Sequence, residues 1–408
     1  MARRPTIKDI ARRSGVSESA VSFALNDRPG VSEDTRARVR RIAEELGWQP
    51  NSAARALSGE RSGAVGLVLA RPARTLGAES FFLRLVSGVQ EVLSAGRIAL
   101  LFQVVEDVDA ECAVYRRWWA ERRVDGVIVV DPRIDDPRPE LLAGLGLPAV
   151  MVGGPDVPGT EPPGTEPAGT EPARPELTGP AGTEPPGTGP AGTEPPGTEP
   201  PGTEPAGTEP ARPELTGPAV PSARLPSTIR ADDAGAMIQV LEHLHGLGHR
   251  RITHLAGLPG LAHTARRMAS LRTWSEGRGL GPDRVRSVVT DYSDTEGAAA
   301  TRRILAEPAP PTALVFDNDV MALAGLAVAT ELGIPVPARL SIVAWDDSAL
   351  CRVTHPRLTA LVRDTAAFGR LAAEELMAVL AGGVPRTRQS ELPRLEPRES
   401  TAPPPTAY

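Results

Sequence analysis

TIKDIARRSGVSESAVSFAL, the stretch from Thr6 to Leu25, holds two short amphipathic helix patterns separated by a glycine. Apolar residues recur at helical spacing in the first pattern, at Ile7, Ile10 and Ala11. Thr6 and Asp9 fit the start of that helix, and Gly15 fits the positive φ that ends it. Ser17 fits the cap of the second helix. This arrangement predicts a helix-turn-helix, in which the second helix enters the major groove of DNA.

A third helix is expected to complete this small domain. The second helix places Val21, Ala24 and Leu25 on its apolar face and leaves Glu18, Ser19, Ser22 and Phe23 outward. The third begins at Ser32, ends at Gly47, and has an apolar face of Val39, Ile42, Ala43 and Leu46. Helices this short are stable only when they share a core, so the three form one headpiece.

Length and composition indicate a protein of several domains. The chain has 408 residues, more than one ordinary domain. Two cysteines, Cys112 and Cys351, are too few for a disulfide framework and suit a reducing cytosol. The sequence contains no apolar run long enough to span a membrane, and its first residues lack the apolar stretch of a signal peptide. We therefore expect a cytoplasmic protein.

Residues 154–223 form a low-complexity insertion in which GTEP occurs eight times. The segment holds two Lys or Arg against eleven Asp or Glu, a net charge of −9, whereas residues 1–61 carry +4. Frequent proline and scarce aliphatic residues predict an extended, solvated loop without a core. A repeat expansion tolerated in a surface loop explains this tract best, because loop-closure entropy grows slowly with length. A proline-rich docking tract is the alternative.

Apolar strands alternate with helical stretches on both sides of the insertion. Before it, strands are predicted at 65–70, 98–104, 125–131 and 148–154, with helices over 82–95 and 110–123. After it, strands are predicted at 251–257, 285–291, 312–318 and 340–347. Continuous apolar strands separated by helices predict parallel sheets covered on both faces.

The headpiece resembles that of the lactose-repressor (LacI) family of bacterial transcription regulators. The matching pieces are TIKDIA, GVS, AVS, ALN at Ala24–Asn26, PGVS at Pro29–Ser32, TR at Thr35 and Arg36, LGWQPN at Leu46–Asn51, and AL at Ala56 and Leu57. A bare helix-turn-helix pattern also occurs in unrelated helical hairpins, but this ordered run of matches argues against that alternative.

The rest of the chain resembles the family's core nearly to its end, apart from the insertion. The matching pieces are RADDAGAM (Arg230–Met237), LGHRRITHLAG (Leu247–Gly257), DNDVMALAG (Asp317–Gly325), LGIPVPARLSIVAWDD (Leu332–Asp347) and RES (Arg398–Ser400). The resemblance implies an α/β fold, with an all-α headpiece and a periplasmic-binding-protein-like core of two doubly wound parallel-sheet lobes. We expect the headpiece at 1–61, the N-lobe at 62–153 with a return segment at about 362–383, and the C-lobe at 224–361 with about 386–401.

Several headpiece residues are candidates for DNA contact. Glu18 suits a cytosine amino group, Ser19 suits either base type, and Phe23 offers apolar contact such as with a thymine methyl. Packing within the headpiece is the alternative for Phe23. The predicted DNA-binding set is Thr6, Ser17, Glu18, Ser19, Ser22, Phe23, Asn26, Asn51, Ala54 and Leu57.

The last three of these residues lie in PNSAARALSG, residues 50–59, which resembles the family's hinge helix. A helix under ten residues is not stable alone. Small side chains such as Ala54 would let two such helices approach in a dimer, and Leu57 would then wedge into a minor-groove step. The tail TAPPPTAY lacks a heptad repeat, so a homodimer is expected rather than a tetramer.

Carboxylate and amide groups end the C-lobe strands, where parallel sheets place their ligands. Asn318 with Asp319 and Asp346 with Asp347 follow two of these strands, and such groups suit the hydroxyls of a sugar. The resemblance puts Asp346 at the family's sugar-binding aspartate, and either Arg266 or Arg267 at its ligand-binding arginine. Asp319 is equally plausible as a helix cap. Phe81 and Trp345 could wall the pocket, since apolar sugar faces stack on aromatic rings, but buried packing is the default interpretation for both. The predicted effector-binding set is Phe81, Arg266, Asn318, Trp345 and Asp346.

Enzymatic function is not supported by any motif. The sequence lacks a Walker loop, a GxSxG elbow, an HExxH pair and a cysteine cluster, and its six histidines lack metal spacing. No cofactor is expected. The predicted function is a ligand-responsive, DNA-binding regulator, in the form of a dimeric repressor of a carbohydrate-utilisation operon whose effector binds between the lobes. The alternative is a cytosolic sugar-binding module without operator binding.

Overall fold

The computed structural model describes residues 5–48, 61–71, 80–154 and 225–405. The predicted hinge segment at 50–59 and nearly all of the predicted insertion lie outside the described residues.

Three helices form the headpiece, as the sequence predicts: α1 (Ile7–Ser14), α2 (Glu18–Leu25) and α3 (Glu33–Glu45). The Asp9 carboxylate accepts hydrogen bonds from the backbone N–H and the hydroxyl of Thr6 at 2.9 and 2.7 Å, which fixes the start of α1. Gly15 ends α1 with a φ of 72°, and the Ser17 hydroxyl accepts from the Ala20 N–H to begin α2. The buried core of the headpiece comprises Ile10, Ala11, Val21, Ala24, Val39, Ile42 and Ala43.

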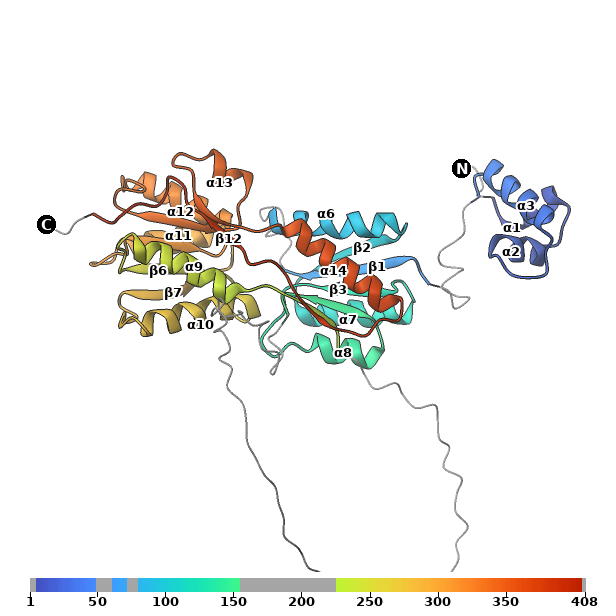
Figure 1. The fold of residues 1–408 in the computed structure, drawn as a ribbon, viewed down its shortest axis with the longest axis horizontal. Coiled ribbons are helices and arrows are strands. Elements are labelled where there is room, and N and C mark those ends of the chain that lie inside the picture. The colour runs from blue at the N-terminus through green and yellow to red at the C-terminus, as the bar shows by residue number, and fades with distance from the viewer. Residues whose placement is uncertain (1–4, 49–60, 72–79, 155–224, 406–408) are drawn as a thin grey trace, which may run out of the picture. The chain divides into compact units, whose positions relative to one another are not determined.

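Lobe 1 is built on a six-stranded sheet with the strand order β11-β5-β4-β3-β1-β2, and its paired strands run parallel. These strands are β1 (Ala64–Ala70), β2 (Ala99–Val105), β3 (Gly126–Val129), β4 (Ala149–Val152), β5 (Ser227–Arg230) and β11 (Thr387–Gln389). Helices α6 (Ser80–Ala95) and α14 (Thr365–Leu380) cover one face, and α7 (Val108–Ala120) and α8 (Arg138–Leu145) cover the other (Figure 1). The inner strands are therefore buried on both faces, in agreement with their continuous apolar sequences.

Lobe 2 repeats this plan with the strand order β12-β10-β9-β8-β6-β7. Its strands are β6 (Ile252–Ala256), β7 (Val285–Val289), β8 (Ala313–Phe316), β9 (Ser341–Trp345), β10 (Thr359–Val362) and β12 (Arg394–Glu396), of which β12 is antiparallel to β10. Helices α9 (Asp233–Gly246) and α10 (Ala262–Glu276) pack on one face, and α11 (Asp294–Leu305), α12 (Asp319–Glu331) and α13 (Ala349–Val353) pack on the other.

The two sheets have the same strand order, and this order indicates where a ligand would bind. The order is β2-β1-β3-β4-β5 in lobe 1 and β7-β6-β8-β9-β10 in lobe 2. The chain reverses its direction of winding between β1 and β3, and again between β6 and β8. Doubly wound sheets bind ligands at the carboxyl ends of their strands, at such reversals.

The lobe boundaries differ from those predicted. The C-lobe was expected to begin at residue 224, but β5 pairs with β4 and belongs to lobe 1. The C-terminal segment at 386–401 was expected in the C-lobe, yet β11 pairs with β5 in lobe 1, and β12 joins lobe 2. Short polar strands such as β11 carry no apolar signal, and their sheet is decided by backbone pairing alone.

Candidate functional site

The first turn of α2 presents the polar side chains that the sequence predicts for DNA contact. Glu18 and Ser19 are exposed, Ser22 is partly exposed, and Phe23 is 38% exposed. Phe23 also approaches the loop before α3, because a Cβ atom on Gly30 would lie 3.7 Å from its ring. One side of Phe23 therefore has a packing role, and the other is open for apolar contact with a base.

The end of α2 is held by an arginine whose role was not predicted from the sequence. Arg36 in α3 has an 11% exposed side chain and donates hydrogen bonds to the carbonyl oxygens of Ala24 at 3.3 Å and Arg28 at 3.1 Å. These bonds satisfy carbonyls in the last turn of α2 and just after it, and they tie this end of α2 to α3. The Thr-Arg pair in the sequence was the available signal.

The remaining DNA-binding candidates have mixed positions. Thr6 and Ser17 cap helices, and the exposed Asn26 follows α2 with its amide 3.5 Å from the Ser22 hydroxyl. Asn51, Ala54 and Leu57 lie outside the described residues.

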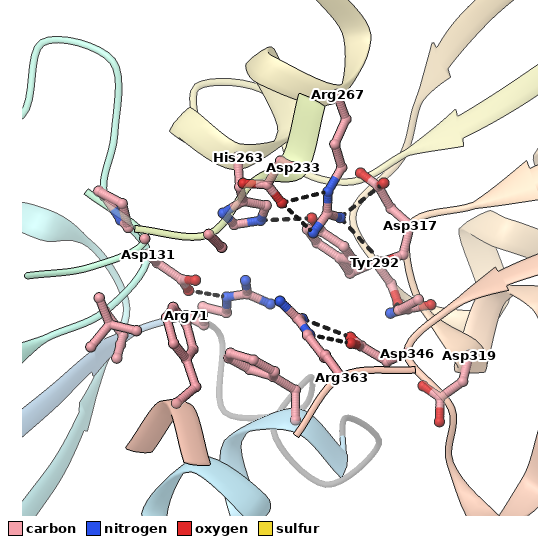
Figure 2. A pocket seen from close by; sticks show the side chains of 18 residues that line it. Arg71, Asp131, Asp233, His263, Arg267, Tyr292, Asp317, Asp319, Asp346 and Arg363 are labelled. Atoms are coloured by element: carbon pink, nitrogen blue, oxygen red, sulfur yellow. Dashed lines mark hydrogen bonds and ion pairs between the residues drawn. The ribbon is translucent and has the colours of Figure 1, made fainter. Parts of the chain in front are cut away.

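A cleft of about 60 Å³ lies at the carboxyl ends of the strands of both lobes (Figure 2). Five aspartates and three arginines line it, together with the aromatic rings of Phe81, Tyr292 and Phe368 and with His263. The charged residues are Asp131, Asp233, Asp317, Asp319, Asp346, Arg71, Arg267 and Arg363. Such a lining combines many hydrogen-bonding groups with a few apolar ring faces.

Two arginines extend into the cleft and point toward each other. Arg71, which follows β1, donates from Nε to Asp131 Oδ2 at 2.6 Å, and its guanidinium lies 5.0 Å from the ring centre of Tyr292. Arg363 donates from Nε and Nη2 to the Asp346 carboxylate at 2.5 and 3.0 Å, and lies 4.5 Å from the ring centre of Phe81. Both guanidinium groups are thus fixed by a carboxylate and an aromatic face.

The pKa of Asp131 responds to this pairing. Burial by itself would raise the pKa of the Asp131 carboxyl, but the adjacent Arg71 guanidinium holds it below its usual range. Asp131 therefore stays ionised at neutral pH.

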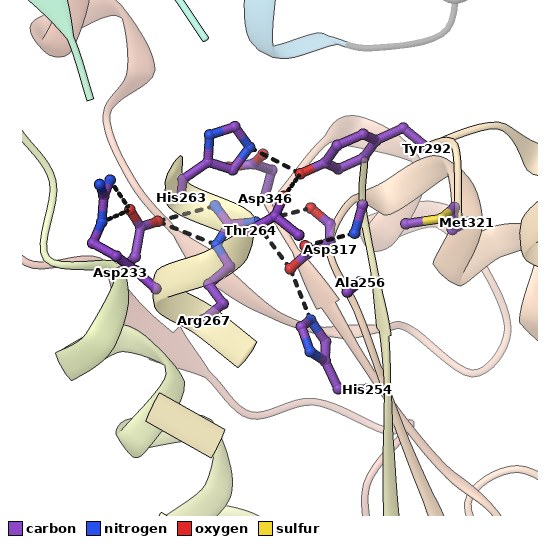
Figure 3. A network of polar contacts seen from close by, with 12 residues as sticks. Asp233, His254, Ala256, His263, Thr264, Arg267, Tyr292, Asp317, Met321 and Asp346 are labelled. Atoms are coloured by element: carbon purple, nitrogen blue, oxygen red, sulfur yellow. Dashed lines mark hydrogen bonds and ion pairs between the residues drawn. The ribbon is translucent and has the colours of Figure 1, made fainter. Parts of the chain in front are cut away.

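A buried charge network supports the floor of the cleft (Figure 3). Asp317 Oδ1 lies 2.9 Å from Arg267 Nη1 and 2.9 Å from His254 Nε2, and Asp317 Oδ2 accepts from the Gly257 N–H at 2.8 Å. Burial opposes ionisation, yet Arg267 and His254 hold the pKa of Asp317 well below its usual range. These contacts keep the Arg267 guanidinium charged and hold it in one orientation as a hydrogen-bond donor.

Beside this network, His263 and Tyr292 form a polar pair. His263 Nε2 lies 2.9 Å from the Tyr292 hydroxyl, which is also 3.2 Å from the Thr264 hydroxyl. Tyr292 packs where β6 ends, since a Cβ atom on Gly257 would overlap its ring. Burial, followed by the charge of Arg267, lowers the pKa of His263 to about 4. The cleft therefore presents a neutral imidazole at neutral pH.

Three of the five predicted effector residues line the cleft: Phe81, Asn318 and Asp346. The Asn318 side chain is engaged locally, because its oxygen caps α12 by accepting from the Met321 N–H and its amide donates to the Tyr292 carbonyl. Asn318, and not Asp319, is therefore the cap of that helix.

The other two predicted effector residues do not line the cleft. Arg267 lines it in place of Arg266, which points to the Gly153 carbonyl in lobe 1. Trp345 is 1% exposed and lies beneath Arg267, whose guanidinium is 3.9 Å from the centre of the tryptophan rings. Neither side chain faces the cleft, because the side chain of a residue next to a site can point away from it, on a helix or on a strand.

Several lining residues were not predicted from the sequence. Asp131 ends one predicted strand and Tyr292 directly follows another, so the rule that placed Asn318 at the site would have included them. Arg363 follows β10, a short strand that was not recognised.

Among the described residues, no group of three or more His, Cys, Asp or Glu side chains is arranged to hold a metal ion. In the same part of the chain, no helix has the length and apolarity needed to cross a bilayer.

Comparisons with known proteins agree with both parts of this architecture. Residues 6–51 match the family model of bacterial regulatory proteins of the lacI family, and residues 241–401 match a periplasmic binding protein-like domain. The HTH-type transcriptional regulator CelR of Thermobifida fusca is 28% identical over 384 residues, covering 93% of each chain. AglR of Rhizobium meliloti, also an HTH-type transcriptional regulator, is 25% identical over 390 residues, covering 96% of this chain and 90% of AglR.

Solved structures show the same fold. A LacI family transcriptional regulator from Bifidobacterium animalis subsp. lactis is 28% identical with a TM-score of 0.62, over 85% of this chain and 100% of that one. A CelR–cellobiose complex is 24% identical with a TM-score of 0.60, over 97% of this chain and 100% of that one. The headpiece, the two-lobed core and these full-length relatives together show that the chain belongs to the LacI family of bacterial transcriptional regulators.

Proposed function

We propose that this regulator is a cytoplasmic, homodimeric repressor of carbohydrate-utilisation genes, and that an uncharged carbohydrate binds in the cleft as its effector. The observation that carries the proposal is the lining of the cleft, where carboxylates, guanidinium groups and aromatic faces meet at the reversals of two doubly wound sheets. Carboxylates accept hydrogen bonds from sugar hydroxyls, guanidinium groups donate to them, and apolar sugar faces stack on aromatic rings.

The charge of the lining favours a ligand without negative charge. Five aspartates face three arginines, and each of these arginines already lies against a carboxylate. A phosphorylated or carboxylated ligand would meet excess negative charge at close range. A solved structure of a complex of the transcriptional regulator CelR holds cellobiose, a neutral disaccharide, which supports the same ligand class here.

The size of the cleft implies that a ligand must widen it. A cavity of about 60 Å³ has room for only a few water molecules. A sugar ring enters when the lobes separate about the segments that join them, or when Arg71 and Arg363 withdraw. Hinge motion of this kind is common in two-lobed binding proteins.

DNA binding is assigned to α2. We propose that Glu18, Ser19, Ser22 and Phe23 face base edges, that Thr6, Ser17 and Asn26 face the phosphate backbone, and that Asn51, Ala54 and Leu57 act in the minor groove. A core that has lost operator binding is the competing function. The exposed polar first turn of α2 favours an active headpiece, because a headpiece without DNA contact does not need this arrangement.

One pair of experiments tests the proposal. Neutral mono- and disaccharides, sugar phosphates and uronic acids are screened by thermal shift, where a ligand at a hundred times its Kd adds about 2.7 kcal/mol of stability. A response to a neutral sugar is expected, and a response confined to anionic or nucleobase ligands overturns the ligand class.

In parallel, the full-length protein selects duplexes from a random DNA library, and Glu18→Ala is expected to lose preference at one base position, worth about 1–3 kcal/mol. Failure to enrich any sequence supports the sugar-binding module instead.

A further inference from the structure

Neighbouring arginines on α10 have different partners. Arg267 faces the cleft and Asp317, as described above. Arg266 reaches into the other lobe, where its Nη2 lies 3.1 Å from the Gly153 carbonyl oxygen and its Nη1 lies 3.5 Å from that of Gly154. These carbonyls belong to the residues directly after β4 of lobe 1, so Arg266 makes a non-covalent contact between the two lobes.

A single carboxylate holds both arginines. Asp233 Oδ2 accepts from Arg266 Nη2 at 2.7 Å, and Asp233 Oδ1 accepts from Arg267 Nε at 3.1 Å. The Asp233 side chain is buried, and Figure 3 shows its contact with Arg267, while Arg266 lies on its other carboxylate oxygen. Burial would raise the pKa of Asp233, but Arg267 and Arg266 keep it below its usual range. Asp233 is thus a fixed charge shared by the cleft and by the contact between the lobes.

Backbone hydrogen bonds join the lobes at the start of the same helix. The Ile134 N–H donates to the Gly260 carbonyl at 2.9 Å, and the Ala262 N–H donates to the Pro132 carbonyl at 2.8 Å. Residues 133 and 261 form an antiparallel bridge between these bonds. The first turns of α10 are therefore attached to lobe 1 through both backbone and side chain, and Arg266 supplies the side-chain part.

We propose that Arg266 is a latch, a contact that holds the two lobes closed, and that Asp233 links this latch to the occupancy of the cleft. A ligand that takes hydrogen bonds from Asp233 or Arg267 alters the charge that orients Arg266, and so changes how firmly α10 is held on lobe 1. The link to occupancy rests on the proposed sugar site, whereas the latch itself does not.

The latch is tested by distances between the lobes in the full-length protein. Spin labels are attached at Ser87→Cys in α6 and Glu276→Cys at the end of α10, which are exposed positions in lobe 1 and lobe 2. The native Cys112 and Cys351 are buried and 5% or less exposed, which protects them from labelling. Arg266→Gln removes the charge, and Arg272→Gln, at an exposed position on the same helix, is the matched control.

The distances are measured by pulsed electron paramagnetic resonance on unliganded protein. Arg266→Gln is expected to show an additional population at longer distance. Because charge-assisted hydrogen bonds are lost, the ratio of closed to open molecules should fall roughly tenfold. Arg272→Gln is expected to match the parent. Arg266→Lys keeps the charge on a shorter, single donor group and is expected to fall between them. Circular dichroism shows whether each variant is folded. If folded Arg266→Gln and Arg272→Gln give the same distribution of distances, Arg266 does not hold the lobes closed.

The link through Asp233 is tested by adding cellobiose, glucose and maltose to the labelled parent and to Arg266→Gln. We expect the sugar that raises the melting temperature of the parent to change its distance distribution, and to change that of Arg266→Gln less. An equal change in both proteins overturns the link. Stabilisation without any change in distance also overturns the link, while it leaves sugar binding intact, so the two proposals fail separately.

Discussion

Three aspartates in the cleft form ion pairs with three arginines of the same cleft. Asp131 pairs with Arg71, Asp346 with Arg363, and Asp317 with Arg267. Because an incoming ligand competes with these partners, its affinity depends on how well its hydroxyls replace an ion pair, not on contact area alone. Asp319 differs, since burial raises its pKa and nearby Asp346 adds to that effect.

His263 gives the cleft a measurable dependence on pH. Its pKa in the folded protein is about 4, against about 6.5 when unfolded. Between these values the unfolded chain binds a proton that the folded protein excludes, so the free energy of unfolding decreases as the pH falls through this window, by at most about 3 kcal/mol. Urea denaturation from pH 7 to pH 4 is expected to show a smaller slope for His263→Asn than for the parent.

The exposed His355, replaced by Asn, is the control for this experiment. An unchanged pH slope in His263→Asn would show that the imidazole titrates normally in the folded protein.

The choice between Arg266 and Arg267 marks the limit of prediction at this scale. The sequence places both on a helix after β6, but successive side chains on a helix differ in direction by a large angle. Trp274, farther along the same helix, packs in the core of lobe 2 and donates to Glu242, so that face of the helix points away from the cleft. Which side chains line the cleft, and which groups they contact, could be determined only from the folded structure.

Elements were predicted far more completely. All eight predicted strands and the three headpiece helices are present, because each carries a continuous apolar run or an amphipathic repeat with a capping residue. The strands that escaped prediction are β5, β10, β11 and β12, each of three or four residues. Signals this short are lost among loops, although these strands decide which lobe their segments join.

Close packing of α6 on α14 depends on two glycines. A Cβ atom on Gly369 would lie 2.1 Å from the Leu85 carbonyl oxygen, and one on Gly88 would lie 1.9 Å from the Ala366 carbonyl oxygen. Gly369→Ala must therefore push the helices apart, and we expect it to reduce the free energy of unfolding by about 1–3 kcal/mol or more in urea titrations.

Gly144→Ala in α8 is the matched control, because no atom lies within 4 Å of the added methyl group. It is expected to be neutral or to stabilise by about 0.5–1 kcal/mol. Equal stability of the two variants would contradict the close contact of α6 with α14.

At the scale of the whole molecule, the insertion interrupts a connection between parallel neighbours. β4 and β5 pair side by side in parallel, so the chain between them must return along the length of the sheet. A tight turn cannot make this connection, which needs about a dozen residues. Deleting residues 160–215 leaves 155–159 and 216–224 for the crossover.

We expect this deletion to preserve the melting temperature, the dimer mass and operator binding, because its sequence lacks the apolar residues that a core requires. Thermal denaturation and light scattering check the first two properties. Insoluble protein, or a clearly lower melting temperature, would assign the GTEP tract a structural role.

For an effector in the cleft to regulate DNA binding, the cleft and the headpiece must respond to the same conformational equilibrium. Two variants separate their contributions. Asp346→Ala removes the carboxylate that holds Arg363 and faces the cleft, so effector affinity is expected to fall about ten- to a hundredfold. Operator affinity without effector is expected to persist, since a ligand can shift only the states that it binds differently. Leu57→Ala, outside the described residues, is expected to do the reverse, because it removes the predicted minor-groove wedge.

Linkage makes this comparison quantitative. In the parent protein, the factor by which the effector changes operator affinity must equal the factor by which operator changes effector affinity. Titrating each ligand in the presence and absence of the other measures both factors. Leu57→Ala weakens operator binding, yet its effector affinity without DNA should match that of the parent. If Asp346→Ala still binds the effector with the affinity of the parent, the effector site lies elsewhere, and the charges that meet in this cleft serve only to hold the lobes together.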